Sequence, residues 1–389
     1  MAALRPFHFE LAVSCLAEIQ RGQRPADAIL REAFKSRPQM GSKDRASVSD
    51  LVYGVLRDYR RLEGLAGSDA AALCKAQLEG VGGDASRLTE AQRLNLPDWL
   101  YTSLIAHHGA DETRAIARAL NQPATVDLRV NTLRGDREQV IALLAKENIA
   151  AAPTALSPLG LRLSKRAPLQ ATATYREGFI EPQDEGSQLL ALLVAPRPGK
   201  VVIDYCAGAG GKTLALGALM RNQGTIHAFD SNAQRLAKFA PRAQRAGLTI
   251  VKQRVLKPST SLGDLTATAD AILIDAPCSG SGVLRRNPEI RLRSISLERL
   301  ASVQSRLLAS AAALVKPGGV LVYATCSLVN QENEGVLYRF LAEHPDFAID
   351  DAGPVLQAQG VPYEGQLLKL LPHRHGTDGF FAARLRRRS

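Results

Sequence analysis

The feature that most constrains the fold is an alternation of short apolar strands with helices that begins at Lys200. Strands are predicted at residues 201–204, 225–230, 249–251, 271–275 and 320–325, and helices at 213–220, 233–246 and 297–315. Strands this apolar, separated by helices, are typical of a parallel sheet covered on both faces. We therefore predict an α/β, Rossmann-like domain. Its ligands should bind at the carboxyl ends of the strands.

The chain before this domain has a different character. Residues 7–122 are predicted to be helical, with helices at 8–21, 25–36, 42–65, 69–79, 97–108 and 111–121 and a loop at 80–83. After Pro123, a strand (126–131), a helix (137–147) and a strand (159–163) form a small α+β unit, and an apolar helix then ends at Val194. A chain of 389 residues is long enough for more than one core. We expect a helical domain (1–122), a small α+β linker subdomain (123–182) and the main domain (183–389).

A net charge of +11 favours a polyanionic partner, either RNA or DNA. The predicted helix at 42–65 carries basic side chains on one face: Lys43, Arg45, Arg57, Arg60 and Arg61. This face is either solvated or in contact with RNA, and its residues do not decide between the two. The terminal stretch 384–388 is interpreted as a basic tail.

The five cysteines lie far apart and form no Cys-x-x-Cys pair, which argues against a zinc site or a disulfide framework. Glu10 and Glu18 interrupt the apolar pattern of the first twenty residues, so no signal peptide is expected. Long apolar runs of the kind that cross a membrane are also not found. We expect a cytoplasmic monomer with no metal and no membrane partner.

A glycine-rich turn connects the first strand of the main domain to its helix. It reads Asp204-Tyr205-Cys206-Ala207-Gly208-Ala209-Gly210-Gly211-Lys212-Thr213. A phosphate-binding P-loop would need glycine where Cys206 stands, and a dinucleotide fingerprint would need glycine where Thr213 stands. The spacing Asp-x-x-x-Gly-x-Gly suits S-adenosylmethionine, and Asp230, at the end of the second strand, can accept hydrogen bonds from ribose hydroxyls. The alternative is a turn that serves only tight packing of strand and helix.

Two cysteines follow two strands of the main domain. Cys278 comes after Asp275-Ala276-Pro277, and Cys326 comes after Thr325. Methylation of a pyrimidine at carbon 5 needs a thiolate that adds to carbon 6, a base that removes the carbon-5 proton, and a group that hydrogen-bonds the ring nitrogen. Cys326, Cys278 and Asp275 can supply these three functions. The alternative is a pair of buried structural cysteines.

With these motifs the chain resembles the RsmB/NOP/Sun family of S-adenosylmethionine-dependent RNA 5-methylcytosine methyltransferases, in particular its bacterial ribosomal-RNA branch. The resemblance covers residues 125–385. It rests on the glycine-rich turn and the two cysteine motifs, with flanking agreement at Leu128-Arg129-Val130-Asn131-Thr132, Gln183-Asp184, Ser187-Gln188, Arg285-Arg286-Asn287-Pro288-Glu289 and Asp378-Gly379-Phe380-Phe381.

The resemblance implies a class I methyltransferase domain in which Cys326 is the nucleophile, Cys278 assists product release and Asp275 faces the cytosine. It implies cofactor contacts from residues 206–212, Asp230, Arg235 and Asp275. It also implies that the N-terminal helices form a NusB-like RNA-binding domain. DNA cytosine methyltransferases instead use the Pro-Cys cysteine as nucleophile together with a Glu-Asn-Val element. Glu332-Asn333-Glu334 is not that element, and no role is predicted for it.

Two stretches depart from the family pattern. Residues 251–256 contain no acid, although family members usually carry an aspartate there, near the adenine. Arg291-Leu292-Arg293 stands where an aromatic residue is often found, which bears on the substrate more than on the chemistry.

The sequence thus predicts a methyltransferase that modifies carbon 5 of a cytosine in RNA, in 16S ribosomal RNA by resemblance. The rival of a different class is a non-catalytic RNA-binding protein, which would need neither cysteine. A P-loop ATPase is the weaker alternative, because Cys206 breaks its motif.

Overall fold

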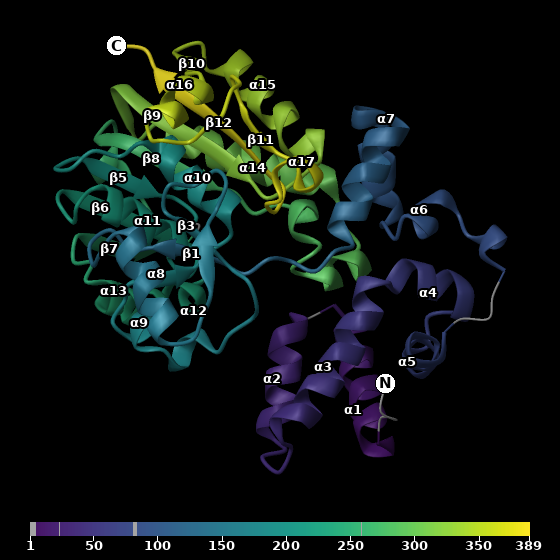
Figure 1. The fold of residues 1–389 in the computed structure, drawn as a ribbon. Coiled ribbons are helices and arrows are strands. Elements are labelled where there is room, and N and C mark those ends of the chain that lie inside the picture. Colours follow the sequence, from purple (N-terminus) through teal and green to yellow (C-terminus); the bar gives the residue numbers. More distant parts are fainter. Residues whose placement is uncertain (1–4, 23, 81–83, 258) are drawn as a thin grey trace. The chain divides into compact units, whose positions relative to one another are not determined.

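The computed structural model describes residues 5–22, 24–80, 84–257 and 259–389 (Figure 1). The chain divides into two compact units. The helical unit contains Met1–Ala124 and Gly280–Ser296, and the sheet unit contains Thr125–Ser279 and Leu297–Ser389. The sequence placed its boundaries at residues 122 and 182, and that division into three domains stays a prediction.

The described part of the N-terminal region is helical, as predicted. Its α-helices are α1 (Pro6–Gln20), α2 (Ala26–Lys35), α3 (Ser42–Arg57), α4 (Tyr59–Ala66), α5 (Ala70–Glu79), α6 (Glu90–Arg93) and α7 (Asp98–Leu120), with one 3-10 turn, η1 (Ala85–Arg87). The prediction of a single helix over 42–65 is wrong, because Asp58, with φ −111° and ψ 19°, separates α3 from α4. The predicted gap between residues 108 and 111 corresponds to a kink in α7 at Gly109, whose φ is 73°. Of the predicted loop at 80–83, residues 81–83 lie outside the described residues.

A second segment of chain completes the helical unit. It contains η4 (Ser281–Val283) and η5 (Pro288–Leu292). Within it Arg291 is only 3% exposed and donates to the carbonyls of Asn95 (3.0 Å) and Leu120 (3.2 Å) and to Oδ1 of Asn121 (2.7 Å). Burial, assisted by the charge of Arg57, lowers the pKa of Arg291 to about 9. The arginine that departs from the family pattern therefore fastens this segment to the helices.

The sheet unit contains an eight-stranded sheet in the order β10-β12-β9-β8-β5-β6-β7, with β11 paired to β12. The strands are β5 (Val201–Asp204), β6 (Thr225–Asp230), β7 (Val251–Val255), β8 (Ala269–Asp275), β9 (Val315–Thr325), β10 (Phe347–Ile349), β11 (Leu368–Leu370) and β12 (Phe380–Arg387). Pairing from β9 to β7 is parallel, and β12 runs antiparallel to β9. The predicted α/β architecture with a mostly parallel sheet is confirmed.

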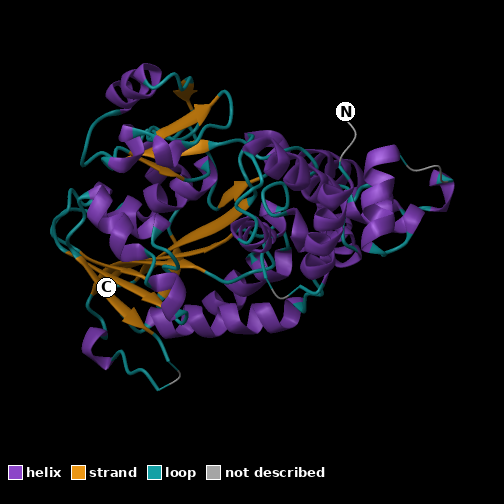
Figure 2. Cartoon of the chain, turned by 90° about the horizontal axis from the view of Figure 1, so that it is seen from below, coloured by secondary structure: helices purple, strands orange, loops and turns teal. Residues whose placement is uncertain are grey.

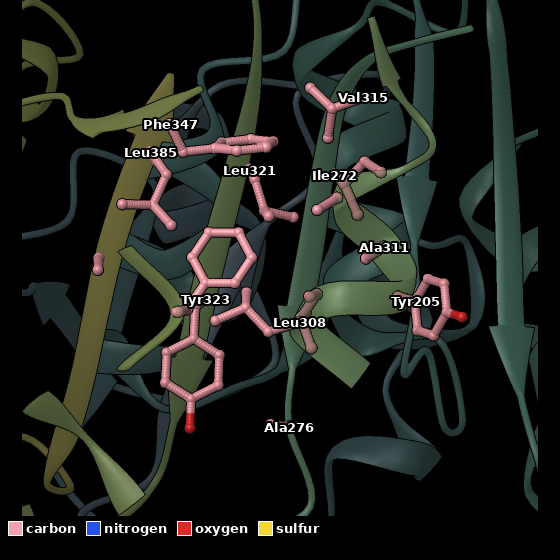
Figure 3. Close-up of a cluster of buried hydrophobic side chains, with 14 of the residues drawn as sticks. Tyr205, Ile272, Ala276, Leu308, Ala311, Val315, Leu321, Tyr323, Phe347 and Leu385 are labelled. Atoms are coloured by element: carbon pink, nitrogen blue, oxygen red, sulfur yellow. The ribbon is translucent and has the colours of Figure 1, made fainter. Parts of the chain in front are cut away.

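Helices lie on both faces of this sheet (Figure 2). They are α10 (Glu185–Val194), α11 (Gly211–Leu219), α12 (Ala233–Leu236), α13 (Phe239–Ala246), α14 (Leu297–Ala312), α15 (Glu334–Glu343), α16 (Ala352–Gln357) and α17 (Pro372–His375), with 3-10 turns η3 (Gly263–Leu265) and η6 (Asn330–Glu332). Strand side chains alternate between the two faces of the sheet. Ile272 and Leu321 belong to the cluster of buried side chains on the face covered by α14 and α15 (Figure 3). Leu273 and Val322 pack on the other face, against α10 and α11. Burial of both faces explains why these strands read as continuous apolar runs.

A smaller antiparallel sheet precedes this one in the sheet unit, in the order β2-β3-β1-β4. It consists of β1 (Asp127–Val130), β2 (Ala151–Pro153), β3 (Gly160–Leu163) and β4 (Ile180–Pro182), accompanied by α8 (Arg137–Lys146), η2 (Leu169–Ala171) and α9 (Ala173–Arg176). The sequence predicted β1, α8 and β3 but missed β2 and β4, which are three residues long.

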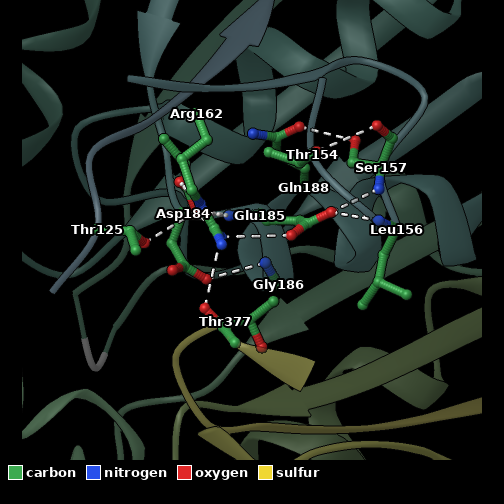
Figure 4. A network of polar contacts seen from close by, with 12 residues as sticks. Thr125, Thr154, Leu156, Ser157, Arg162, Asp184, Glu185, Gly186, Gln188 and Thr377 are labelled. Carbon is green, nitrogen blue, oxygen red and sulfur yellow. Dashed lines mark hydrogen bonds and ion pairs between the residues drawn. The ribbon is translucent and has the colours of Figure 1, made fainter. Parts of the chain in front are cut away.

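A buried polar network joins the small sheet to the first turn of α10 (Figure 4). Arg162 donates to both oxygens of Asp127, at 2.7 and 3.0 Å, and lies 3.5 Å from Glu185. The fully buried Glu185 also accepts from the backbone N–H of Ser157 at 2.8 Å, while Asp184 accepts from Gly186 N–H and caps the helix. The Gln183-Asp184 and Ser187-Gln188 motif is therefore structural, because it fixes one sheet against the other.

Two further sequence expectations are corrected in the sheet unit. Residues 233–246 form two helices, α12 and α13, in place of one. The stretch 384–388 is not a basic tail, because residues 384–387 belong to β12 and Arg384 is 6% exposed. Arg384 and Arg386 both pair with Asp350, and Arg387 pairs with Asp346, so charge alone misled the interpretation.

Among the residues that the structure describes, no helix is long and apolar enough to cross a membrane. The same described part of the chain holds no cluster of His, Cys, Asp and Glu that could bind a metal.

We expect Arg291→Ala to destabilise the helical unit by about 3 kcal/mol, because two buried backbone carbonyls lose their donor. Trp99, in α7, is the single tryptophan of the chain, so urea unfolding followed by its fluorescence reports on this unit. Arg293→Ala, at an exposed position two residues on, is the control and should change stability by less than about 0.5 kcal/mol. Equal unfolding curves for the two variants would show that Arg291 does not anchor the segment.

Candidate active site

The register of β8 against β9 brings the two cysteine motifs together. Asp275 is paired with Ala324, and the N–H of Ala276 donates to the carbonyl of Ala324 at 2.8 Å. The residues that follow each strand consequently leave the same edge of the sheet side by side. The sulfur atoms of Cys278 and Cys326 are 3.3 Å apart, and both residues are partly exposed.

A buried carboxylate, Glu332, connects the two cysteine loops. Its Oε1 accepts from the N–H of Ser279 (2.8 Å) and from Gln304 (3.0 Å), and its Oε2 accepts from the hydroxyl of Ser327 (2.6 Å). Ser279 follows Cys278 and Ser327 follows Cys326, so one side chain holds the residue after each cysteine. Glu332 has no exposed surface, and these donors compensate for the cost of burying its charge.

The loop of Cys326 is held on both sides by a second set of hydrogen bonds. Thr325, before the cysteine, donates its hydroxyl to Oδ1 of Asn333 at 2.6 Å. Asn333 in turn donates to the carbonyl of Ser327 at 2.9 Å, after the cysteine. The backbone on either side of Cys326 is thereby fixed.

A lysine and an aspartate lie beside the cysteine loops. Lys212 Nζ is 2.6 Å from Oδ2 of Asp275, at the carboxyl end of β8. Burial alone would lower the pKa of Lys212, but the charge and hydrogen bond of Asp275, together with Asp204 and Cys326, raise it above its usual value. Lys212 therefore stays an ammonium and contributes positive charge close to Cys326. Lys212, the lysine of the glycine-rich turn, is therefore paired with a carboxylate of the protein itself.

Two glycines of the glycine-rich turn adopt backbone conformations that favour glycine over other residues. Gly208 and Gly210 have φ of 57° and 83°, in the left-handed region that favours glycine. A Cβ at Gly210 would lie 2.0 Å from the ring of Phe239, so this position also allows α13 to pack closely. Around them, Ala207 N–H donates to the carbonyl of Phe229 at 2.7 Å, Arg242 donates to the carbonyl of Ala209 at 2.5 Å, and Gly211 begins α11.

Asp230 and Arg235 lie next to this turn. Asp230 accepts from the backbone N–H groups of Gly208 (2.8 Å) and Asn232 (2.7 Å), and Arg235 is 3.1 Å away. The side chain of Asp230 is 2% exposed and that of Arg235 is 58% exposed, so this ion pair contributes little to stability. Because a carboxylate offers about four acceptor positions, Asp230 keeps capacity for a further donor such as a hydroxyl.

The third cysteine of this region, Cys206, is unsuited to nucleophilic attack. It packs against the apolar core below the sheet edge. Burial, reinforced by the charges of Asp275, Asp204 and Asp230, raises the pKa of its thiol strongly. Cys206 therefore remains protonated, and only its position in the turn relates it to a ligand.

The buried aspartate at the start of the turn, Asp204, has an unusual environment. Its Oδ2 accepts from the Thr213 hydroxyl at 2.7 Å, whereas its Oδ1 is buried without a hydrogen-bond partner among the described residues. Burial raises its pKa to about 6, although Thr213 and Lys212 oppose the shift. This aspartate is therefore partly protonated near neutral pH.

The sequence located the cysteines and the turn but missed Glu332 and Asn333, which it named only to set aside. The signal was present in the serine that follows each cysteine and in an acid six residues beyond Cys326. A side chain that must accept from two loops can be recognised only when the two loops are known to be adjacent.

We expect Glu332→Ala to separate the two cysteine loops without abolishing the fold. In the wild type, the oxidant diamide should rapidly join Cys278 to Cys326, because a disulfide of about 2.0 Å needs only a small approach of the two sulfurs. The variant should form this disulfide at least about tenfold more slowly, and Glu332→Gln should lie between the two. Peptide mapping by mass spectrometry follows the rate.

Glu334→Ala is the matched control for this test. Glu334 pairs with Lys369 at 2.5 Å and is two residues from Glu332, and its replacement should leave the disulfide rate unchanged. If Glu332→Ala oxidised as fast as the wild type, Glu332 would not position the cysteines.

We expect Asp204→Asn to remove a pH-dependent loss of stability. Since the folded-state pKa is raised from 3.8 to about 6, the aspartate favours the folded state while protonated, and this advantage disappears as the pH rises through about 6. The wild type should lose on the order of 3 kcal/mol relative to the variant between pH 4 and pH 7, measured by denaturant unfolding.

The control is Asp264→Asn. Asp264 is exposed, and Arg254 lowers its pKa, so the wild type should not lose stability relative to this variant over the same pH range. A constant difference between wild type and Asp204→Asn across the range would contradict the assignment of a raised pKa to Asp204.

Comparisons with known proteins agree with this geometry. The family model described as 16S rRNA methyltransferase RsmB/F matches residues 191–386, and the RsmF/B-like ferredoxin-like domain matches residues 96–170. A curated relative from Synechocystis, named probable ribosomal RNA small subunit methyltransferase B, is 34% identical over 94% of this chain and 79% of its own length.

Two solved structures share the fold. PH0851 aligns with a TM-score of 0.82 at 26% identity and covers 99% of both chains. NSun6 from Pyrococcus horikoshii, solved with SFG, aligns with a TM-score of 0.65 at 23% identity over 76% of this chain and 99% of its own. The resemblance inferred from the cysteine motifs and the glycine-rich turn is thus confirmed. The chain belongs to the RsmB/F family of 16S rRNA methyltransferases.

Proposed function

We propose that the protein transfers a methyl group from S-adenosylmethionine to carbon 5 of a cytosine in small-subunit ribosomal RNA, through a covalent bond between Cys326 and carbon 6. The observation that supports this most directly is the 3.3 Å separation of two partly exposed thiols at the carboxyl edge of the sheet. A protein that only binds RNA needs no such pair. Membership of an rRNA methyltransferase family supports the reaction class.

S-adenosylmethionine supplies an electrophilic methyl group when bound. The residues that would hold it are those of the turn from Cys206 to Lys212, with Asp230, Arg235 and Asp275. Asp230 suits this role because it is a buried carboxylate at a strand end with acceptor capacity left, and the exposed side chain of Arg235 beside it is accessible to a ligand. SFG, present in the NSun6 structure, is an analogue of S-adenosylmethionine, which agrees with a cofactor of this class in the shared fold.

Cys326 carries out the attack in this proposal. Its thiolate adds to carbon 6 of the ring, which makes carbon 5 nucleophilic towards the methyl group. The nearby ammonium of Lys212 contributes positive charge close to this sulfur. Asp275 hydrogen-bonds the ring nitrogen through a shared proton, where negative charge gathers as the sulfur adds, and Lys212 fixes the orientation of its carboxylate.

Cys278 assists the release of the product. After methylation, the carbon-5 proton leaves to a base, its electron pair re-forms the double bond between carbons 5 and 6, and the bond from carbon 6 to Cys326 breaks. Cys278 is placed to act as this base, because its sulfur lies in contact with that of Cys326. Glu332 orients both thiols but does not reach the substrate.

The RNA would be bound in part by the N-terminal helices, whose likeness to NusB stays a prediction. Two of the cations on the predicted basic face are engaged by acids, since Arg60 pairs with Glu63 and Asp98 and Arg61 pairs with Asp58. The target cytosine would be presented unpaired, as is usual for enzymes that modify a base. We place this activity in the cytoplasm and in a monomer.

We expect Cys326→Ala to abolish methylation of small-subunit rRNA by labelled S-adenosylmethionine and to form no covalent adduct. Cys278→Ala should also fail to turn over, but it should accumulate a protein–RNA adduct that survives denaturing electrophoresis, because attack and methyl transfer still occur. Cys15→Ala, a buried cysteine of α1, is the control and should retain activity. Normal turnover by Cys326→Ala would refute the assignment of the nucleophile.

A further inference from the structure

A cavity of about 610 Å³ opens at the amino-terminal edge of the large sheet, opposite the cysteines. Its walls include Val202, Ala271 and Val320, at the beginning of the paired stretches of β5, β8 and β9, together with residues of α16 and β12. Thr325 is five residues beyond Val320 along β9, so the cavity lies about 17 Å from the catalytic edge. It therefore cannot hold the reacting cytosine.

Five cationic side chains line this cavity: Arg197, Lys200, Lys316, Arg384 and Arg386. Two carboxylates face them. Asp270 pairs with Lys316 and lies 3.6 Å from Lys200, and Asp350 pairs with Arg384 and, at 2.7 Å, with Arg386. For the side chain of Arg197 the described residues offer no hydrogen-bond or ion-pair partner.

The positive charges that line the cavity outnumber the negative charges near it, even when the partial negative charges at the carboxyl ends of two helices are included. Five cations against two carboxylates leave +3, and the carboxyl ends of α10 and α16, which reach the cavity, contribute about half a negative charge each. A net charge of roughly +2 remains in the cavity.

One of the five cationic side chains, Arg384, is buried without a full set of hydrogen-bond acceptors. Arg384 is 6% exposed, and its Nε has no hydrogen-bond partner among the described residues. Burial, with the charges of Arg386 and Arg197, lowers its pKa to about 10. A guanidinium in this position gains from an anion that brings negative charge and acceptor oxygens together.

We propose that this cavity is a second, non-catalytic binding site for a phosphate group, supplied either by the RNA backbone away from the target cytosine or by a small phosphate. Its volume is within the usual range for ligand pockets. A phosphate offers several acceptor oxygens and up to two negative charges, which matches converging arginines and lysines. The site operates without the cysteines and is independent of the reaction proposed for them.

The test uses the full chain with Arg197→Gln and Lys200→Gln combined, because both side chains are exposed and their neutralisation should not disturb the fold. The matched control combines Lys165→Gln and Arg166→Gln, an exposed lysine and arginine in the small-sheet region of the same unit. One arm measures thermal unfolding in inorganic phosphate against chloride at equal ionic strength. The other measures binding of a small-subunit rRNA fragment across salt concentrations. Neither arm requires methyl transfer.

Phosphate should raise the unfolding temperature of the wild type and the control by roughly 2 °C, and that of the cavity variant by less than half as much. If the RNA backbone occupies the cavity, the slope of log affinity against log salt should become shallower by about one to two in the cavity variant only. A phosphate effect without a change of slope identifies a small phosphate as the ligand. An equal phosphate response and an equal slope in all three proteins would overturn the proposal.

Discussion

The parallel pairing of β8 with β9 determines where the chemistry of this protein takes place. Each strand is apolar on both faces, so helices cover it on either side and leave its carboxyl end free for the reacting groups. The register that pairs Asp275 with Ala324 brings the ends of the two strands level. A slip of one residue would turn each side chain to the other face and move Cys278 away from Cys326. Strand pairing thus brings the two cysteine loops to the same place on the sheet edge, although they are 48 residues apart in the sequence.

The pairing of β8 with β9 does not fix the conformation of the loops that follow these strands. The buried carboxylate of Glu332 does so through its hydrogen bonds. An ionised side chain without exposed surface is expensive unless its acceptor positions are filled. They are filled by Ser279, Ser327 and Gln304, which belong to both cysteine loops and to α14. Movement of either loop would leave part of the charge unpaired. Because burying Glu332 is costly unless these donors stay in place, the buried carboxylate holds both cysteine loops in fixed positions.

Sequence reasoning succeeded where a signal is local. Three features could be predicted because each depends on a few adjacent residues. They are the apolar strands, the glycines of the turn at residues 208 and 210, and the cysteines that follow the strand ends. It failed where a residue acts across the fold. Glu332 was given no role, and Arg384 was assigned to a basic tail although β12 pairs with β9 and Arg384 is buried. The charge of an isolated stretch does not indicate which element will cover it.

The path of the chain after Cys278 shows a second reason why the hydrogen bonds of Glu332 matter for the position of this cysteine. The chain leaves the sheet unit after Ser279 and contributes residues 280–296 to the helical unit, where Arg291 anchors them. Cys278 consequently lies one residue from the point at which the chain passes between units. The bond from Ser279 N–H to Glu332 is made before that point. Through Glu332 it ties the residue after Cys278 to the residue after Cys326, within the sheet unit.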